Sequence, residues 1–424
     1  MRRPYPAYKE TGLEWLGYVP SHWETTKAKW LFANVSEKNC PDEQLLSATQ
    51  EYGVVPRDML EERVVMPMGE LVHFKLVQQG DFVISLRSFQ GGIEYSDYRG
   101  LVSPAYTVLR NRKTIDKTYI KYLMKCFPFI SELQTSVTGI REGKNINYKD
   151  FAEIIIPIPP LSEQTKIAQY IEEQTAVINQ FLTNKRRLIE LLEEQKQVVI
   201  NTAVTQGLDT AVSRKPSGID WLGDIPAHWQ MLRNKYIFTE VSDRSETGEE
   251  LQLSVHQQLG IIPRSEIGDR PMDESPTAGS KRCQIGDLIL NRLKAHLGVF
   301  FRTELEGVVS PDYTVFRPKR DVSTKYFEYL FRHPVYISIW NKTVRGIVAG
   351  FYRLYTDDFG NVPSVFPPPD EQREIVKFID KKTAEINAAI DRTQREIELI
   401  EEYRTTLIAH TVTGKIDVRL NNPK

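Results

Sequence analysis

Basic side chains occur in a few loops of this 424-residue chain, at positions where they could contact a polyanion. Arg87 directly follows an apolar segment, and Arg141, Lys144 and Asn145 lie in a glycine-containing loop further on. Arginine and asparagine can bind guanine and adenine edges through two hydrogen bonds, and lysine and arginine neutralise phosphates. These residue types fit the binding of nucleic acid, although any one of them alone is equally well explained as ordinary surface charge.

A second set of basic residues occupies the equivalent places in the second half of the chain. Arg292 and Lys294 follow the corresponding apolar segment, and Arg345 and Arg353 lie in the later loop. The loops differ, Arg-Ser-Phe-Gln-Gly-Gly in one half and Arg-Leu-Lys-Ala-His-Leu-Gly in the other, whereas the segments around them are alike. Similar scaffolds with different loops favour two modules that recognise different sequences. We therefore predict that both sets bind DNA.

Little in the sequence indicates catalysis or metal binding. The loop 139–145 lacks the spacing and the Ser/Thr of a phosphate-binding loop, and the three cysteines are scattered. His22 and His228 stand at equivalent places beside tryptophans, so we interpret them as structural. The Gly-Asp pairs at 80–81 and 286–287 resemble turns. We expect no catalytic residue, no metal and no cofactor in this chain.

The elements that must position these loops are duplicated. The segment 12–23 returns as 218–229, an offset of 218 − 12 = 206 residues, with seven of the twelve positions identical. A Gly-Asp motif, a Val-Ser-Pro-x-Tyr motif and a Pro-Pro-x-x-Glu-Gln motif follow in the same order in both halves. An offset of this size is that of a whole domain with a connector, so the chain is predicted to be two copies of one module.

Each copy ends in a predicted long helix. Ser162 and Asp370 are favoured N-cap types, and neither proline nor glycine follows before about Val204 and Val412. Heptad rows run along both segments: Ile171, Ile178, Lys185, Leu192 and Val199 in the first, and Ile379, Ile386, Thr393, Ile400 and Leu407 in the second. Rows of this length predict helices of about 40 residues, roughly 60 Å long.

We expect the two helices to pair as an antiparallel coiled coil, with the polar members Lys185 and Thr393 near one level. The alternatives are that each helix packs on its own domain or on a partner protein. The composition is that of a soluble globular protein, with 41% hydrophobic residues and a net charge of −1. No apolar stretch reads as a signal peptide or as a membrane span, so a cytoplasmic protein is expected.

The repeated order of motifs resembles the specificity subunit of type I restriction–modification systems. The residues that carry the resemblance are Trp15-Leu-Gly with Pro20-Ser-His-Trp23, Gly-Asp, Val-Ser-Pro-x-Tyr, and Pro-Pro-x-x-Glu-Gln before a long helix, each present twice. The resemblance implies an α+β fold with two tandem, similar target recognition domains separated by two long helices that form an antiparallel coiled coil. The expected boundaries are 1–161 and 207–369 for the recognition domains, 162–206 and 370–414 for the helices, and 415–424 for a tail.

The resemblance also implies a function. Each domain would read one half of a split, asymmetric double-stranded DNA target, while the helices set the spacing and dock two methyltransferase subunits. Restriction subunits with translocase activity would join, and S-adenosylmethionine, ATP and magnesium would be bound by these partners only. An exchangeable module that works with a methyltransferase alone would have the same sequence features. A standalone nuclease or a pure protein scaffold is a less favoured alternative.

Overall fold

The computed structural model describes residues 4–60, 70–86, 88–135, 146–219, 222–257, 259–267, 278–348 and 351–419. The chain divides into two compact units, Met1–Arg186 with Gln394–Lys424, and Arg187–Thr393. Each unit contains one α+β domain together with parts of two long helices. The division therefore runs through the helices, whereas the sequence predicted domain boundaries at their ends.

The first domain is built on a four-stranded antiparallel sheet in the order β4-β11-β8-β9. Its strands are β4 (Phe32–Val35), β11 (Thr107–Asn111), β8 (Phe82–Ile84) and β9 (Glu94–Tyr95). Side chains alternate across the sheet: Phe82 and Ile84 enter one hydrophobic core, and Val83 enters another. Because both faces of β8 are covered, this strand is apolar throughout, Phe-Val-Ile.

Shorter elements complete the first domain. They are β1 (Tyr8–Glu10), β2 (Tyr18–Pro20), β3 (Glu24–Lys27), α1 (Ala28–Leu31), β5 (Leu46–Thr49), β6 (Gly53–Pro56), η1 (Arg57–Met59), η2 (Leu71–His73), β7 (Lys75–Val77), α2 (Ser88–Gly91), β10 (Gly100–Val102), α3 (Lys117–Lys125), α4 (Phe127–Thr135), α5 (Tyr148–Glu153) and β12 (Ile155–Ile158). Strand β12 pairs with β3, which brings the end of the domain beside its beginning.

The second domain repeats this sheet. Its strands are β16 (Phe238–Val241), β23 (Tyr313–Pro318), β20 (Leu288–Asn291) and β21 (Phe300–Arg302), in the order β16-β23-β20-β21. Leu288 and Leu290 enter the larger core, and Ile289 between them enters the smaller one. The duplication seen in the sequence therefore extends to strand order and to the division of the core.

The second domain also contains shorter elements. They are β13 (Arg214–Pro216), β14 (Asp224–Pro226), β15 (Gln230–Arg233), η3 (Asn234–Tyr236), β17 (Leu253–His256), β18 (Gly260–Pro263), η4 (Arg264–Glu266), β19 (Lys281–Cys283), η5 (Arg292–Leu297), β22 (Gly307–Val309), α7 (Thr324–Phe331), α8 (Pro334–Thr343), β24 (Arg345–Val348), β25 (Phe351–Arg353), α9 (Thr356–Asn361) and β26 (Pro363–Phe366).

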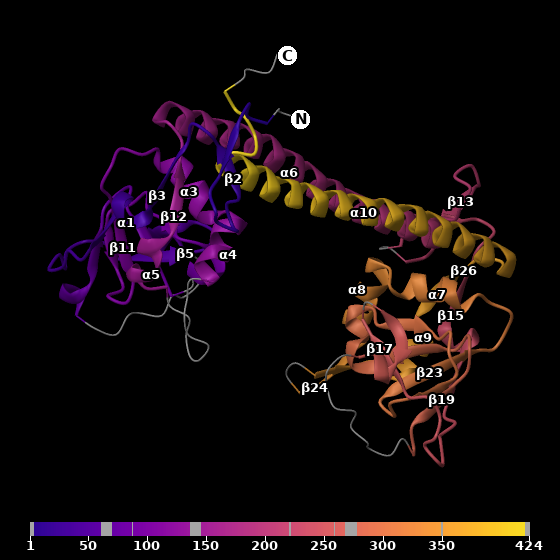
Figure 1. Cartoon of the computed structure of the whole chain (residues 1–424). Helices are drawn as coiled ribbons and strands as arrows, with labels where there is room; N and C mark the ends of the chain where they lie inside the picture. Colours follow the sequence, from indigo (N-terminus) through magenta and orange to yellow (C-terminus); the bar gives the residue numbers. More distant parts are fainter. Residues whose placement is uncertain are drawn as a thin grey trace. The chain divides into compact units, whose positions relative to one another are not determined.

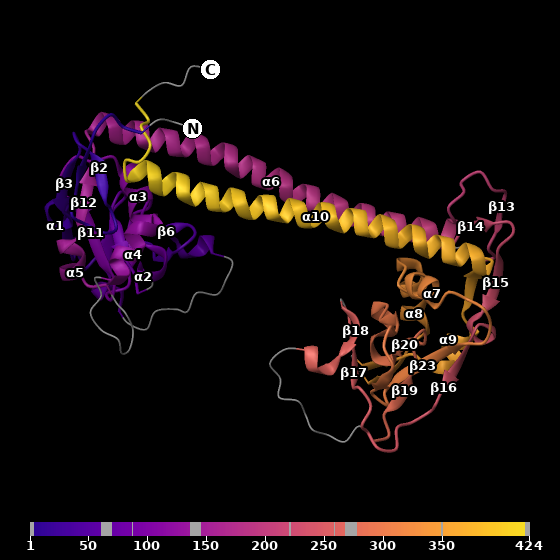
Figure 2. The same cartoon turned by 45° about the vertical axis from the view of Figure 1, so that its right-hand side comes forward.

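Two long helices, α6 (Leu161–Gln206) and α10 (Pro369–Val412), lie side by side (Figures 1 and 2). In the first unit, Asn179 bonds to Arg404 at 2.9 Å and Lys185 pairs with Glu396 at 2.6 Å. The residue numbers of the partners on α10 fall as those on α6 rise, so the two helices run antiparallel. In the second unit, Lys196 bonds to Asn387 at 3.0 Å in the same sense. The predicted antiparallel coiled coil is confirmed.

The heptad rows lie on the inner face of this pair. Ile178 and Ile386 are each 7% exposed, whereas the neighbouring Val177 is 67% exposed. The other members of the rows are buried or half-buried: Ile171, Lys185, Leu192, Val199, Ile379, Thr393, Ile400 and Leu407. Of the two polar members, Lys185 pairs with Glu396 on α10, and the Thr393 hydroxyl donates to the Ala389 carbonyl of its own helix. That Lys185 and Thr393 lie near one level stays a prediction.

The helix ends are also part of the domain cores. Ile167 near the start of α6 and Val412 at the end of α10 are buried in the core of the first domain. Val204 near the end of α6 and Ile375 near the start of α10 are buried in the core of the second. Packing on the domains and helix pairing, which the sequence offered as alternatives, therefore both occur. Within the described part of the chain, no helix is both long and apolar enough to cross a membrane.

Candidate nucleic-acid interface

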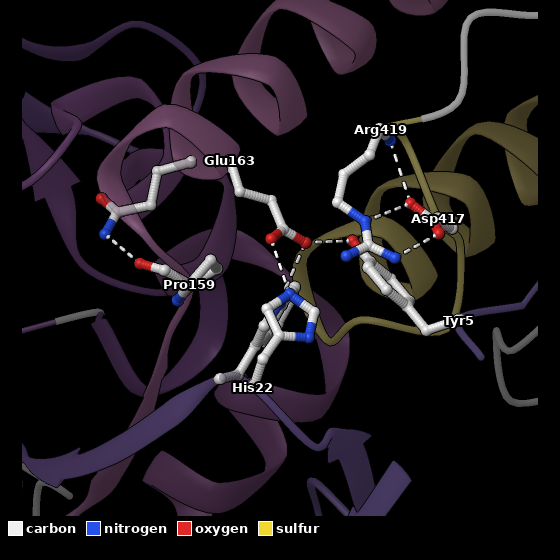
Figure 3. Close-up of polar contacts among 8 residues, drawn as sticks. Tyr5, His22, Pro159, Glu163, Asp417 and Arg419 are labelled. Carbon is white, nitrogen blue, oxygen red and sulfur yellow. Dashed lines mark hydrogen bonds and ion pairs between the residues drawn. The ribbon is translucent and has the colours of Figure 1, made fainter. Parts of the chain in front are cut away.

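The repeated Pro-Pro-x-x-Glu-Gln motif attaches each long helix to its domain. Glu163, in the first turn of α6, accepts hydrogen bonds from the Tyr5 hydroxyl at 2.6 Å and from Trp23 Nε1 at 3.0 Å (Figure 3). His22 Nε2 lies 2.8 Å from the other carboxylate oxygen. Burial, followed by the hydrogen bond to Glu163, raises the pKa of Tyr5 well above its ordinary value, so Tyr5 remains a donor.

The next residue of the motif completes the attachment. The Gln164 side chain donates to the carbonyl of Pro159 at 2.8 Å and accepts from the backbone N–H of Asp116, also at 2.8 Å (Figure 3 shows the first of these bonds). Residues after the end of α10 contact the same region: the Arg419 guanidinium lies 4.8 Å from the Tyr5 ring and pairs with Asp417 at 2.8 Å.

The second copy uses the same groups. Glu371 accepts from Trp229 Nε1 at 3.0 Å and lies 2.8 Å from His228 Nε2. Gln372 donates to the Pro367 carbonyl at 2.9 Å and accepts from Ser323 N at 2.9 Å. His22 and His228 thus have the structural role that the sequence suggested: they hold the segment that contains the tryptophan against the helix.

The Gly-Asp motifs also have a structural role. Asp81 accepts from the Gln78 N–H at 2.9 Å and from Arg110 Nε and Nη2 at 3.0 and 2.9 Å. Asp287 makes the equivalent bonds to Gln284 and Arg317, the latter at 2.8 and 2.7 Å. Both aspartates close the turn before the central strand, as interpreted from the sequence, and each ties it to a neighbouring strand.

This frame brings three of the predicted basic residues together in the second domain. Strand β25 packs on η5, where the Leu354 N–H donates to the Arg292 carbonyl at 3.1 Å. Arg345 and Arg353 are register partners in the β24–β25 hairpin. We call Arg292, Arg345 and Arg353 the arginine cluster. His296 and Tyr352 pack edge to face beside it, with ring centroids 5.8 Å apart.

The arginine cluster holds like charges close together. Burial, and after it the charge of Arg353, lowers the pKa of Arg292. The Arg292 Nε and Nη2 groups donate to the carbonyls of Asp312 and Pro311. The nearby carboxylates are Asp358, 2.6 Å from Arg345, and Asp312, 3.9 Å from Arg353, together with Glu240 near Arg292 and Asp357 near Arg345. These carboxylates balance part of the positive charge, so a polyanion would meet chiefly the exposed guanidinium of Arg345.

The remaining predicted residues are placed less fully. Lys294 is exposed on η5, next to the arginine cluster in sequence. Arg87, Arg141, Lys144 and Asn145 lie outside the described residues. The candidate interface is therefore seen in the second domain, and its counterpart in the first domain stays a prediction.

Sequence reasoning missed the residues that support the cluster. Tyr355 places its ring 5.7 Å from the Arg345 guanidinium and 5.9 Å from that of Arg353. Asp358 pairs with Arg345 from α9. Asp312 could have been noticed, since it occupies the variable position of the repeated Val-Ser-Pro-x-Tyr motif. No local pattern marks Asp358. In the described part of the chain, no group of three or more His, Cys, Asp or Glu residues could hold a metal ion.

The chain thus contains two copies of one α+β domain on long paired helices, and a cluster of arginines lies at the loops of the second copy. Comparison with known proteins shows what the chain is similar to. Residues 20–193 match the family described as the type I restriction modification DNA specificity domain. This match covers most of the first domain and much of α6.

Relatives and solved structures extend the similarity to nearly the whole chain. The MjaVIII specificity subunit of Methanocaldococcus jannaschii is 22% identical over 95% of this chain and 94% of its own. The EcoKI specificity subunit of Escherichia coli K12 is 23% identical over 74% and 69%. The crystal structure of the HsdS subunit from Thermoanaerobacter tengcongensis has a TM-score of 0.58 at 16% identity, and covers 96% of this chain and 100% of that one.

A second structure, from work on complex assembly and conformational transition of the type I R-M system, has a TM-score of 0.64 at 13% identity and covers 93% and 98% of the two chains. At such identities the structures show the fold alone. Together with the family match and the named relatives, they support a type I restriction–modification specificity subunit, and the resemblance seen in the sequence is confirmed.

Proposed function

We propose that this chain is the DNA-reading, non-catalytic subunit of a type I restriction–modification complex, and that each domain reads one half of a bipartite, asymmetric DNA target. The observation that carries the proposal is the contrast between frame and loops. The two sheets have the same strand order and the same Asp–Arg ties. The loops after β8 and β20 differ, and in the second domain the loop after β20 supplies Arg292, while the β24–β25 hairpin supplies Arg345 and Arg353.

The paired helices would set the distance between the two half-sites and dock partner subunits. Leu191 on α6 and Leu399 on α10 occupy equivalent positions, at an offset of 399 − 191 = 208, and they are 45% and 50% exposed. Exposed leucines at equivalent positions support the docking of two like partners, for which we propose two methyltransferase subunits. Restriction subunits with translocase activity would complete the complex.

The cofactors would belong to those partners. S-adenosylmethionine, ATP and magnesium are proposed on the methyltransferase and restriction subunits, and none on this chain. We further propose a cytoplasmic location, where the complex meets DNA. The similarity to a structure from work on assembly of a type I complex supports a role as one subunit among several.

A domain exchange tests the proposal. Residues 24–150 are replaced by the equivalent segment of a relative, and the methylated sequence of the host genome is determined before and after. We expect one half of the target to change and the other half to stay the same. The matched control replaces 230–358 and should change the opposite half. An exchange that alters both halves would contradict independent reading.

A further inference from the structure

The most exposed member of the arginine cluster, Arg345, is oriented by an ion pair. Arg345 Nη2 donates to Asp358 Oδ1 at 2.6 Å. The Arg345 side chain is 68% exposed, whereas that of Asp358 is 17% exposed. The ion pair therefore orients the guanidinium while most of its surface faces solvent.

The carboxylate is itself placed at a cost. Asp358 Oδ2 is buried and has no hydrogen-bond partner among the described residues. An unpartnered buried oxygen is unfavourable for folding. Asp358 lies in the first turn of α9, and its other oxygen, Oδ1, accepts the hydrogen bond from Arg345. The Asp358 carboxylate is therefore placed to orient Arg345.

Tyr355 supports the same arginine from a second side. Its ring centroid lies 5.7 Å from the Arg345 guanidinium, within the range of a cation–π contact. Arg353, the register partner of Arg345, lies 5.9 Å from the ring. Like charges opposite each other in a hairpin repel, and the ring together with Asp358 compensates part of this repulsion. The conformation of Arg345 is thus restricted before any ligand arrives.

The other two members of the cluster are less available to a ligand. Arg292 uses its Nε and Nη2 groups on backbone carbonyls of the 311–312 turn. Only 28% of the Arg353 side chain is exposed. Arg345 is therefore the arginine of the cluster that can reach a ligand with its planar edge.

A planar, oriented guanidinium matches one DNA feature in particular. Guanine presents O6 and N7 side by side in the major groove, and arginine donates to both. The guanidinium fork also matches a phosphate, but a lysine can replace it there as a point charge. Reading a base depends more strongly on orientation, because the O6 and N7 acceptors of guanine have fixed positions.

We propose that Arg345 reads a guanine in the half-site of the second domain and that Asp358 is a positioning residue that orients it. This inference rests on the proposed function, since it takes the second domain to read one half-site.

The experiment uses the assembled complex and the target known from its methylation pattern. Binding is measured by competition, at two salt concentrations, against duplexes in which each G·C pair of the half-site is replaced in turn. Arg345→Lys keeps the charge and removes the planar fork. We expect it to lose about tenfold to hundredfold discrimination at one guanine and to keep the salt dependence of binding. Asp358→Asn should lose discrimination at the same position, with other positions unaffected.

Two outcomes would overturn the inference. If Arg345→Lys discriminates as the wild type does, while Arg345→Ala lowers the salt slope by about one unit, Arg345 contacts a phosphate. If Asp358→Asn lowers the melting temperature and weakens binding to all duplexes equally, Asp358 is merely structural. The matched control is Glu398→Gln on α10, which breaks an exposed ion pair with Arg395 at 3.0 Å and should leave discrimination unchanged.

The failure of this inference differs from that of the proposed function. A wild-type complex that discriminates no sequence at all would contradict the proposed function. A wild-type complex whose second half-site is read without a guanine would leave the proposed function intact and overturn the assignment of Arg345.

Discussion

The indole nitrogen of Trp23 donates to the carboxylate of Glu163 at 3.0 Å, across 140 residues of chain. Trp229 and Glu371 repeat this bond at 3.0 Å in the second copy. Each long helix is thus attached in its first turn to the segment that opens its domain. In each copy the domain and the start of its long helix are thereby held together.

Removing this acceptor should destabilise the first unit more than the second. Glu163→Ala leaves the N–H of Trp23 and the hydroxyl of Tyr5 without their partner in a buried site, and the expected loss is about 1–3 kcal/mol. Glu371→Ala should cost less, because 24% of the Glu371 side chain is exposed, against 5% of Glu163. Calorimetric melting of both variants measures the difference. Equal losses of stability in the two variants would show that burial of the carboxylate does not decide how much it contributes to the free energy of unfolding.

The helix seam should not tolerate a charge. Ile178→Asp places a carboxylate on the inner face of α6, where the isoleucine is 7% exposed, and should cost about 3 kcal/mol or more. The adjacent Val177→Asp is the matched control, since Val177 is 67% exposed and the change should be nearly neutral. Thermal melting and size-exclusion chromatography measure the effect, and Ile386→Asp should repeat it on α10. Similar melting of the two neighbours would contradict the inward orientation of the row.

The stability of the second domain should depend on the protonation of His333. Burial lowers the pKa of His333 from 6.5 to about 4, and its Nδ1 accepts the Val335 N–H at the start of α8. Between these pH values the unfolded chain binds the proton more readily than the folded domain does. The stabilisation of the fold by neutral His333 is therefore fully present above pH 6.5 and is lost as the pH falls towards 4. Its size is of the order of 1–2 kcal/mol after discounting for partial exposure to solvent.

The substitution His333→Asn isolates that contribution. Asparagine keeps an N-cap acceptor and does not titrate. Chemical denaturation of both proteins from pH 7 to about pH 4 should show a smaller loss of stability in the variant. Parallel pH profiles would mean that His333 is protonated in the folded domain without penalty.

The salt dependence of DNA binding should identify the phosphate contacts. If Lys294, Arg353, Arg141 and Lys144 neutralise phosphates, each change to alanine should lower the salt slope of the assembled complex by about one unit and weaken binding to all sequences alike. Competition binding on cognate and scrambled duplexes at two salt concentrations measures this. Should all four variants bind as the wild type does, with an unchanged salt slope, none of these residues would contact a phosphate.

The sequence by itself determined the duplication, the limits of the long helices and the heptad face that they bury. These features depend on residues close together in the chain, such as Ser162 before a proline-free segment or Ile171 and Ile178 seven residues apart. Because an α-helix has about 3.6 residues per turn, residues at this spacing lie on one face of the helix. The structural use of His22 could also be anticipated, because the same histidine and tryptophan recur in the second copy.

The tertiary structure decided which polar groups meet. The sequence gives no reason for Asp358 on α9 to orient Arg345 on β24, or for Tyr355 to lie beside two arginines. These contacts arise because β25 packs on η5 and α9 follows the hairpin closely, so they depend on how separate elements pack. The partner of Lys185 was likewise decided by the register of α6 against α10, which places Glu396 within 2.6 Å. A local pattern specifies an element and its buried face, whereas a pairwise contact between elements depends on the packing of the whole domain.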